Sequence, residues 1–153
     1  MLNSTEKTSF SHREHRDHTE IAELNQLTQT VIGCAITVHK ELGAGLLESV
    51  YRQCLAHEIK KLDLLAEQEV SVPLEYDGLF FETAYRADIL VNRTLLIEIK
   101  NVEKINDVHK AQTLTYTKIL NYPIGLLINF HETLLKNGIH RFINTNINSV
   151  DSV

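Results

Sequence analysis

The hydrophobic residues of this chain recur with two different spacings, which predict an alternation of helices and strands. Spacings of three and four residues are typical of amphipathic helices, and they occur over residues 20–42, 46–62 and 106–120. Alternating or continuous apolar runs are typical of strands, and they cover residues 66–76, 79–81, 85–91, 95–100, 124–130 and 139–143. A chain of 153 residues is long enough for one domain with a proper core.

Polar residues between the apolar runs predict how the strands connect. Asp77-Gly78 and Asn92-Arg93 each stand between two strand-like runs, so each predicts a tight hairpin turn. Pro73 cannot donate a backbone hydrogen bond, which indicates that the first strand lies at a sheet edge. The uninterrupted apolar run 124–130 is expected of a strand that is covered on both faces.

Both ends of the chain are polar and are expected to lie outside the domain. We predict a disordered tail over residues 1–18, a folded domain over residues 19–144 with Thr19 as its first helix cap, and a polar tail over residues 145–153. Three histidines in the first segment would align on a helix and could bind a metal ion: His12, His15 and His18. The lack of an apolar stripe there favours the tail.

Composition excludes several classes of protein. No run is long and apolar enough to cross a membrane, and the first twenty residues lack the apolar core of a signal peptide. Cys34 and Cys54 have no CxxC spacing, so they are expected to be reduced residues of a cytoplasmic protein. The net charge of -5 argues against bulk electrostatic coating of nucleic acid. Residues 84–141 nevertheless carry eight Lys and Arg against five Asp and Glu, which permits an anionic substrate.

Charged residues interrupt two of the apolar strands. Asp88 lies in the run 85–91, and Glu98 and Lys100 lie in the run 95–100 with Ile99 between them. Because side chains alternate across a strand, Glu98 and Lys100 face one side and Ile99 faces the other.

Two explanations of these charges stay open from the residues alone. A salt bridge from Lys100 to Glu98 or Asp88 at a sheet edge would satisfy them. A divalent-metal site would do so too, with the carboxylates as hard oxygen ligands and Lys100 beside a bound water.

Three further polar residues lie on predicted helices. Glu48 is in the first turn of its helix, where the dipole alone favours a carboxylate. Gln112 and Tyr116 occupy a stripe that is otherwise apolar. They could form a buried hydrogen-bonded pair, or they could orient a metal ligand, a water or a phosphate.

Three motifs in order along the chain resemble a known family. Gly45-Leu46-Leu47-Glu48-Ser49-Val50-Tyr51 fits GxxExxY, Asp88 with Glu98-Ile99-Lys100 fits the PD-(D/E)XK nuclease pattern, and Gln112-Thr113-Leu114-Thr115-Tyr116 fits the QxxxY element of its lambda-exonuclease-like branch. Over residues 25–144 the chain therefore resembles the GxxExxY family of the PD-(D/E)XK nuclease superfamily. It departs from the pattern at Ala44 and Ala87, where proline is expected, and neither position supplies a metal ligand.

The resemblance implies an α/β fold with a PD-(D/E)XK (restriction-endonuclease-like) core, in which helices flank a central mixed β-sheet. It also implies a Mg²⁺ or Mn²⁺ site formed by Asp88, Glu98, the Ile99 carbonyl and Glu48. Lys100 would serve the attacking water, while Gln112 and Tyr116 would support the ligands or the phosphate.

The function that the resemblance implies is hydrolysis of phosphodiester bonds in DNA or RNA by a metal-dependent nuclease. A non-catalytic binding or adaptor module with a nuclease fold is the alternative, because members of the superfamily have lost catalysis while keeping the fold. A small phosphodiester or nucleotide is a third substrate class. A ring of identical copies or a protein partner could enclose the substrate of so small an enzyme.

Overall fold

The computed structural model describes the backbone of residues 4–146 and the side chains of residues 18–146. The chain forms two compact units, residues 1–33 and residues 34–153. In the first unit, the described residues belong to a single helix that continues into the second. The elements are α1 (Ser4–Leu42), α2 (Glu48–Lys60), β1 (Ala66–Tyr76), β2 (Leu79–Val91), β3 (Leu95–Lys100), α3 (Asp107–Ile119), β4 (Ile124–Asn129), η1 (Leu135–Gly138) and β5 (Ile139–Ile143).

The first helix differs from the sequence prediction. It begins at Ser4, so residues 4–18 are helical and the prediction of a disordered tail there is wrong. The segment has no apolar stripe but contains no glycine or proline, and extending an existing helix costs far less than nucleating one. The predicted C-terminal tail lies outside the described residues from position 147 onward, while Thr145 and Asn146 form a short helical turn.

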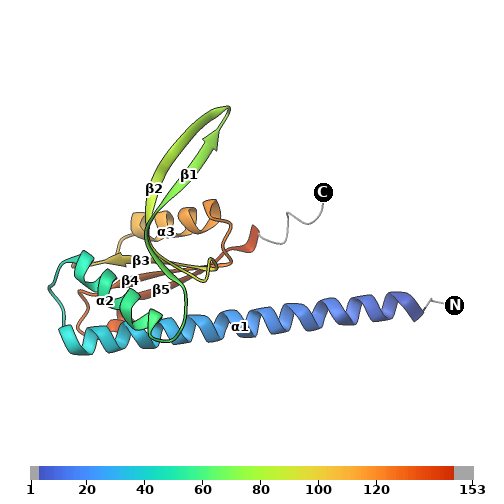
Figure 1. Cartoon of the computed structure of the whole chain (residues 1–153), viewed down its shortest axis with the longest axis horizontal. Helices are drawn as coiled ribbons and strands as arrows, with labels where there is room; N and C mark the ends of the chain where they lie inside the picture. Colours follow the sequence, from blue (N-terminus) through green and yellow to red (C-terminus); the bar gives the residue numbers. More distant parts are fainter. Residues whose placement is uncertain (1–3, 147–153) are drawn as a thin grey trace. The chain divides into compact units, whose positions relative to one another are not determined.

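The five strands form one mixed sheet in the order β1-β2-β3-β4-β5 (Figure 1). Only β3 and β4 are parallel, and α3 provides the crossover that parallel neighbours require. Both predicted turns are confirmed, since Asp77, Gly78, Asn92 and Arg93 all have the positive φ of hairpin turns. β1 is an edge strand as predicted, and its register shifts between Val72 and Leu74, where Pro73 interrupts the ladder.

Helices cover both faces of the sheet in the second unit. On one face, Tyr51 of α2 stacks on Phe130, which follows β4, with a ring separation of 4.5 Å. On the other face, α3 lies directly over Gly125 of β4. Residues 125 and 130 differ by an odd number and therefore point to opposite sides of the strand. The predicted fold, a mixed sheet flanked by helices, is confirmed.

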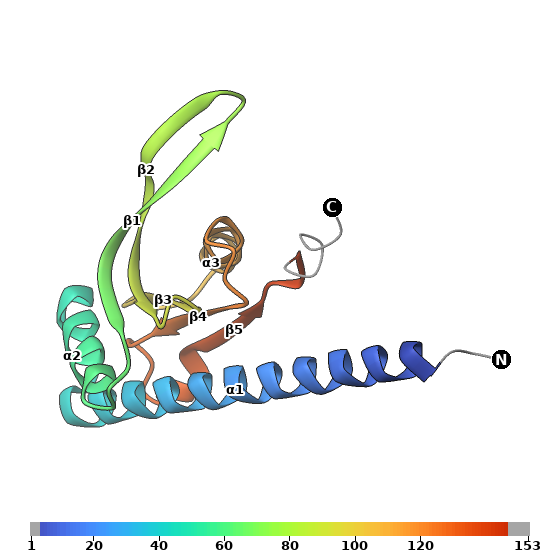
Figure 2. The same cartoon turned by 45° about the vertical axis from the view of Figure 1, so that its right-hand side comes forward.

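The β1–β2 hairpin extends beyond the rest of the sheet (Figure 2). β3 pairs with β2 only at Ile89–Val91, so the outer part of the hairpin is a two-stranded ribbon. Its tip exposes four large apolar side chains: Tyr76, Leu79, Phe80 and Phe81. None of the helices in the described part of the chain is long and apolar enough to span a membrane.

Replacing Gly125 by alanine is expected to destabilise the fold by about 1–3 kcal/mol. A Cβ atom at this buried position would collide with Oγ1 of Thr117, whose hydroxyl donates to the Thr113 carbonyl at 2.7 Å. Urea denaturation would measure the loss. Gly33→Ala is the matched control, because a Cβ there meets nothing within 4 Å and alanine favours a helix. Equal stability of Gly125→Ala and the unmodified protein would contradict this account of α3 packing.

Candidate active site

The predicted site residues surround one cavity of about 260 Å³ at the carboxyl end of β3. We call it the polar cavity. It lies on the α3 face of the sheet, because Glu98 is paired with Leu127, which points to the same side as Gly125. Its lining residues come from α2, β2, β3 and α3, and they are Glu48, Tyr85, Arg86, Asp88, Glu98, Ile99, Lys100, His109, Gln112, Thr113 and Tyr116.

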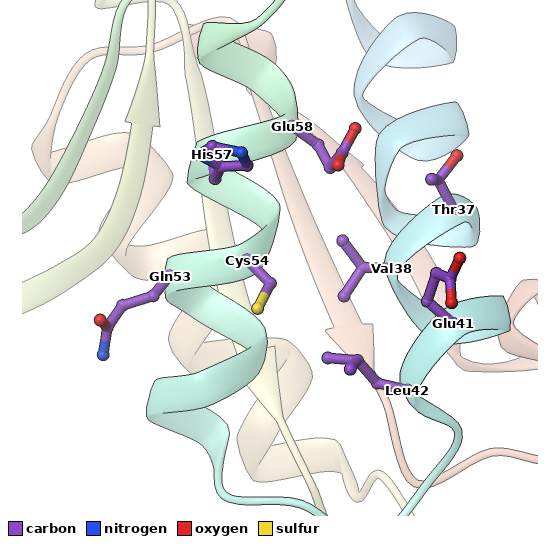
Figure 3. Close-up of a pocket in the computed structure, with 8 residues that line it drawn as sticks. All are labelled: Thr37, Val38, Glu41, Leu42, Gln53, Cys54, His57 and Glu58. Carbon is purple, nitrogen blue, oxygen red and sulfur yellow. The ribbon is translucent and has the colours of Figure 1, made fainter.

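A larger and mainly apolar cavity of about 320 Å³ lies between the last turns of α1 and α2 (Figure 3). In Figure 3 the Glu58 carboxylate points from α2 toward α1. This cavity contains none of the residues that the sequence motifs select. Chemistry is therefore assigned to the smaller polar cavity, where charged side chains converge.

Asp88 and Glu98 lie side by side on neighbouring strands. The antiparallel register pairs Ile89 with Ile97, so one residue further along the ladder Asp88 stands opposite Glu98. Asp88 Oδ2 accepts a 2.8 Å hydrogen bond from the Ile99 backbone N–H. Glu98 is only 8% exposed, and its buried Oε1 has no hydrogen-bond partner among the described residues.

Burial and mutual repulsion make it costly for both carboxyls to be ionised. Burial and, to a smaller extent, the charge of the adjacent Asp88 together raise the pKa of Glu98 to about 9. Burial also raises the pKa of Asp88, although the Ile99 N–H partly offsets that effect. Without a bound cation, the pair therefore retains a proton at neutral pH.

Lys100 lies at the end of β3 on the same side as Glu98, as predicted. It is half-buried, and its carbonyl accepts a 2.9 Å hydrogen bond from the Phe130 N–H. Within residues 18–146 no ion pair joins Lys100 to Asp88 or Glu98. The simpler explanation of these charges, a salt bridge to Lys100, is therefore wrong.

The GxxExxY segment forms a tight loop followed by the start of α2, and this arrangement brings Glu48 to the polar cavity. Gly45 has φ of +99°, a conformation that L side chains rarely adopt. Tyr51 ties the loop together, because its hydroxyl donates to the Gly43 carbonyl at 2.5 Å and accepts from the Leu46 N–H at 3.1 Å. Glu48 then begins α2. The motif residues thus have structural roles that the spacing alone did not reveal.

Glu48 is near the other two carboxylates but is already engaged. Its Oε1 accepts a 3.1 Å hydrogen bond from the Asn101 N–H, and Asn101 Nδ2 donates to the Leu46 carbonyl. Its negative charge still raises the pKa of Asp88. No group of three or more His, Cys, Asp or Glu in the described chain is placed to hold a metal ion. The structure therefore brings together two carboxylates, with Glu48 at the cavity wall.

The helix α3 places Gln112 and Tyr116 on the cavity wall, but not as a buried pair. Gln112 is exposed, so of the two alternatives for this pair the buried Gln–Tyr hydrogen bond does not hold. The fully buried residues of α3 are instead Thr113 and Thr117, whose hydroxyls donate to the carbonyls one turn earlier. Those bonds satisfy the hydroxyls and allow threonine to face the sheet.

Tyr116 is held by a partner on β2. Its ring stacks on that of Tyr85 at 3.8 Å between centroids, and the Tyr85 hydroxyl donates to the Tyr116 carbonyl at 3.0 Å. Both rings pack against a buried cluster formed by Val72, Ala87, Leu90 and Leu96. This contact fixes α3 over the carboxylate pair.

Two basic cavity residues, Arg86 and His109, were missed at the sequence level. Arg86 is two positions before Asp88 in the same strand, so alternation could have placed both on one side. His109 precedes Gln112 by three positions and Tyr116 by seven, which is the spacing of one helix face. Both residues could have been found by applying strand and helix periodicity to the site residues that the motifs select.

The sequence matches the PD-(D/E)XK nuclease superfamily over residues 25–142, and the chain belongs to this superfamily. The match spans α2, α3 and all of the sheet except the last residue of β5, and so includes every residue of the polar cavity. Neither a curated protein nor a solved structure matches the chain significantly.

Proposed function

We propose that this protein is a metal-dependent nuclease that hydrolyses phosphodiester bonds of DNA or RNA. The observation that carries the proposal is the adjacent pair of buried Glu98 and half-buried Asp88, which lines the polar cavity beside Lys100. Two adjacent carboxyls with raised pKa values, of which the buried Glu98 has an unpartnered oxygen, are stabilised by a cation more readily than by protein groups.

The residues present fit a hard divalent ion, Mg²⁺ or Mn²⁺. Asp88, Glu98 and the Ile99 carbonyl would hold it, with Glu48 binding directly or through a water. When bound, the ion would supply Lewis-acid activation of water and positive charge against the phosphate. The unpartnered Oε1 of Glu98 is the specific feature that such a ligand would satisfy.

The protein's own groups would perform the remaining tasks. Lys100 would orient the attacking water or take up its proton, since it ends the strand that carries Glu98. Gln112 and Tyr116 on the α3 wall would support the ligands or the scissile phosphate, with Tyr116 held in place by Tyr85. The finer assignment to the GxxExxY family and its lambda-exonuclease-like branch is part of this proposal, as is a cytoplasmic location.

A non-catalytic adaptor is the second candidate, and the β1–β2 hairpin favours it. Its tip exposes Phe80 at 68% and Tyr76 at 69%, as expected of a surface that contacts another protein. A protein partner or a second copy of the chain could bind there. The polar cavity favours the nuclease over the adaptor, because binding another protein at the hairpin requires no carboxyl beside the buried Glu98.

Labelled single- and double-stranded DNA and RNA, incubated with pure protein and Mn²⁺, would test the nuclease proposal. We expect cleavage that stops with chelator and falls by more than about a hundredfold in Glu98→Ala, which loses a ligand. Glu75→Ala on the hairpin is the matched control, since Glu75 is exposed and outside the cavity. Cleavage shared equally by Glu98→Ala would indicate contamination. No cleavage of any substrate would favour the adaptor.

A further inference from the structure

The first turn of α3 fixes the ring of His109 by an unusual capping box. The Asn106 side chain accepts a 2.9 Å hydrogen bond from the His109 N–H, and the Asn106 N–H donates to His109 Nδ1 at 3.2 Å. Glu or Gln ordinarily accepts this second bond, and here an imidazole replaces it. The ring is therefore held against the N-terminal turn of the helix.

This hydrogen bond determines which nitrogen of His109 carries the proton. Because Nδ1 accepts a hydrogen bond, the proton of the neutral ring must be on Nε2. Nε2 lies on the far side of the ring from Nδ1 and has no partner among the described residues. His109 therefore presents one N–H donor in a defined direction while it lines the polar cavity.

The charge distribution of the cavity indicates what this donor would meet. Asp88 and Glu98 occupy the sheet side, so a polyanion can approach only where donors offset them. Lys100 and Arg86 lie beside the carboxylates on the same two strands, and His109 and Gln112 offer donors from the α3 wall. His109 also lies in the first turn of α3, where the helix dipole favours negative charge.

We propose that His109 is a substrate-binding residue whose Nε2–H donates to a non-bridging oxygen of the nucleic-acid phosphate. The inference rests on the proposed nuclease function and extends it to a residue outside the PD-(D/E)XK pattern. The capping box serves the same end, since it fixes the tautomer and the direction of the donor.

Two substitutions separate phosphate binding from helix capping. His109→Glu keeps an acceptor for the Asn106 N–H but replaces the donor with a negative charge. His109→Gln keeps an acceptor and also offers a donor. Both variants keep the acceptor that caps the helix, so their melting temperatures should stay close to that of the unmodified protein. If His109 only capped the helix, the two variants would also bind nucleic acid equally well.

The measurement is the Kd of a short fluorescent oligonucleotide by anisotropy in Ca²⁺, together with KM and kcat in Mn²⁺. We expect His109→Glu to weaken binding and raise KM by about tenfold or more, and His109→Gln to do so by less than about threefold. His57→Glu adds the same charge to an exposed histidine of α2, so it controls for net charge.

Equal Kd values for His109→Glu and His109→Gln would overturn the inference, and so would failure of the unmodified protein to bind the oligonucleotide. Failure of the nuclease proposal alone would give a different result. Oligonucleotide binding would still depend on His109, but neither the unmodified protein nor any variant would cleave in Mn²⁺.

Discussion

Glu98→Gln is expected to raise the melting temperature of the metal-free protein at pH 8 and to leave it almost unchanged near pH 4.5. The pKa of Glu98 is about 9 in the folded protein, against 4.5 for the ordinary group. A carboxyl with a raised folded pKa stabilises the fold below its unfolded pKa, and this stability is lost as the pH rises toward the folded pKa. Glutamine mimics the protonated form at every pH.

The size of this effect follows from linkage. Between about pH 5 and 9 the unmodified protein should lose on the order of 1 kcal/mol of stability per pH unit through Glu98, and Glu98→Gln should lose far less. Asp88→Asn should also stabilise the metal-free protein, because it removes a negative neighbour while its amide oxygen can still accept the Ile99 N–H. Thermal melts in chelator across this pH range would measure both effects.

Metal ions should reverse the order of stability. The unmodified protein should gain about 1.4 kcal/mol at a Mn²⁺ concentration ten times the Kd, because the ion binds only the folded state. Glu98→Gln and Asp88→Asn should lose most of that gain. Glu75→Gln serves as control, since it neutralises an exposed carboxylate of the hairpin. Variants that melt below the unmodified protein in chelator, with no response to Mn²⁺ in any protein, would exclude the metal site.

Lys100→Ala is expected to lower turnover by about 10²–10⁴-fold while leaving Mn²⁺ affinity largely intact. The reason is its position: Lys100 ends β3 beside the carboxylate pair, yet makes no ion pair with it in the described structure. In the proposed nuclease, an ammonium at this position would serve a water or a phosphate, because a protonated amine cannot be a metal ligand. Single-turnover cleavage and calorimetric Mn²⁺ titration would measure the two quantities separately.

Two comparisons make the Lys100 result interpretable. Asp88→Ala should abolish Mn²⁺ binding as well as cleavage, since it removes a ligand. Lys104→Ala removes an exposed lysine of the following loop and should change neither quantity. If Lys100→Ala lost as much Mn²⁺ affinity as Asp88→Ala, the role of Lys100 in serving the water would be wrong.

Much of the fold could be predicted because it depends on local spacing. Most strand ranges followed from alternation, although the predicted runs 79–81 and 85–91 form one continuous strand, β2. Both hairpin turns followed from Asp77-Gly78 and Asn92-Arg93, whose residues adopt positive φ. The shared side of Glu98 and Lys100 is a property of strand geometry alone. The start of α1 could not be predicted, because helix propagation through residues 4–18 leaves no hydrophobic signature.

The environment of each side chain was decided by partners distant in the sequence. Glu48 is held by the Asn101 N–H across 53 positions, so the spacing of the first motif could not show that its carboxylate is engaged. Gln112 is exposed because Thr113 and Thr117 face Gly125, the one residue of β4 that lets α3 approach so closely.

The sequence by itself determined which elements form and which residues could carry chemistry, because helical and strand periodicities are set by the backbone. Only the tertiary structure decided that Asp88 lies beside a buried Glu98 and that, in the described residues, Lys100 forms an ion pair with neither. Whether a carboxyl is ionised or protonated depends on its solvation and its neighbours. The solvation and the neighbours of a carboxyl are set by how the strands and α3 pack together, so a local sequence pattern cannot predict them.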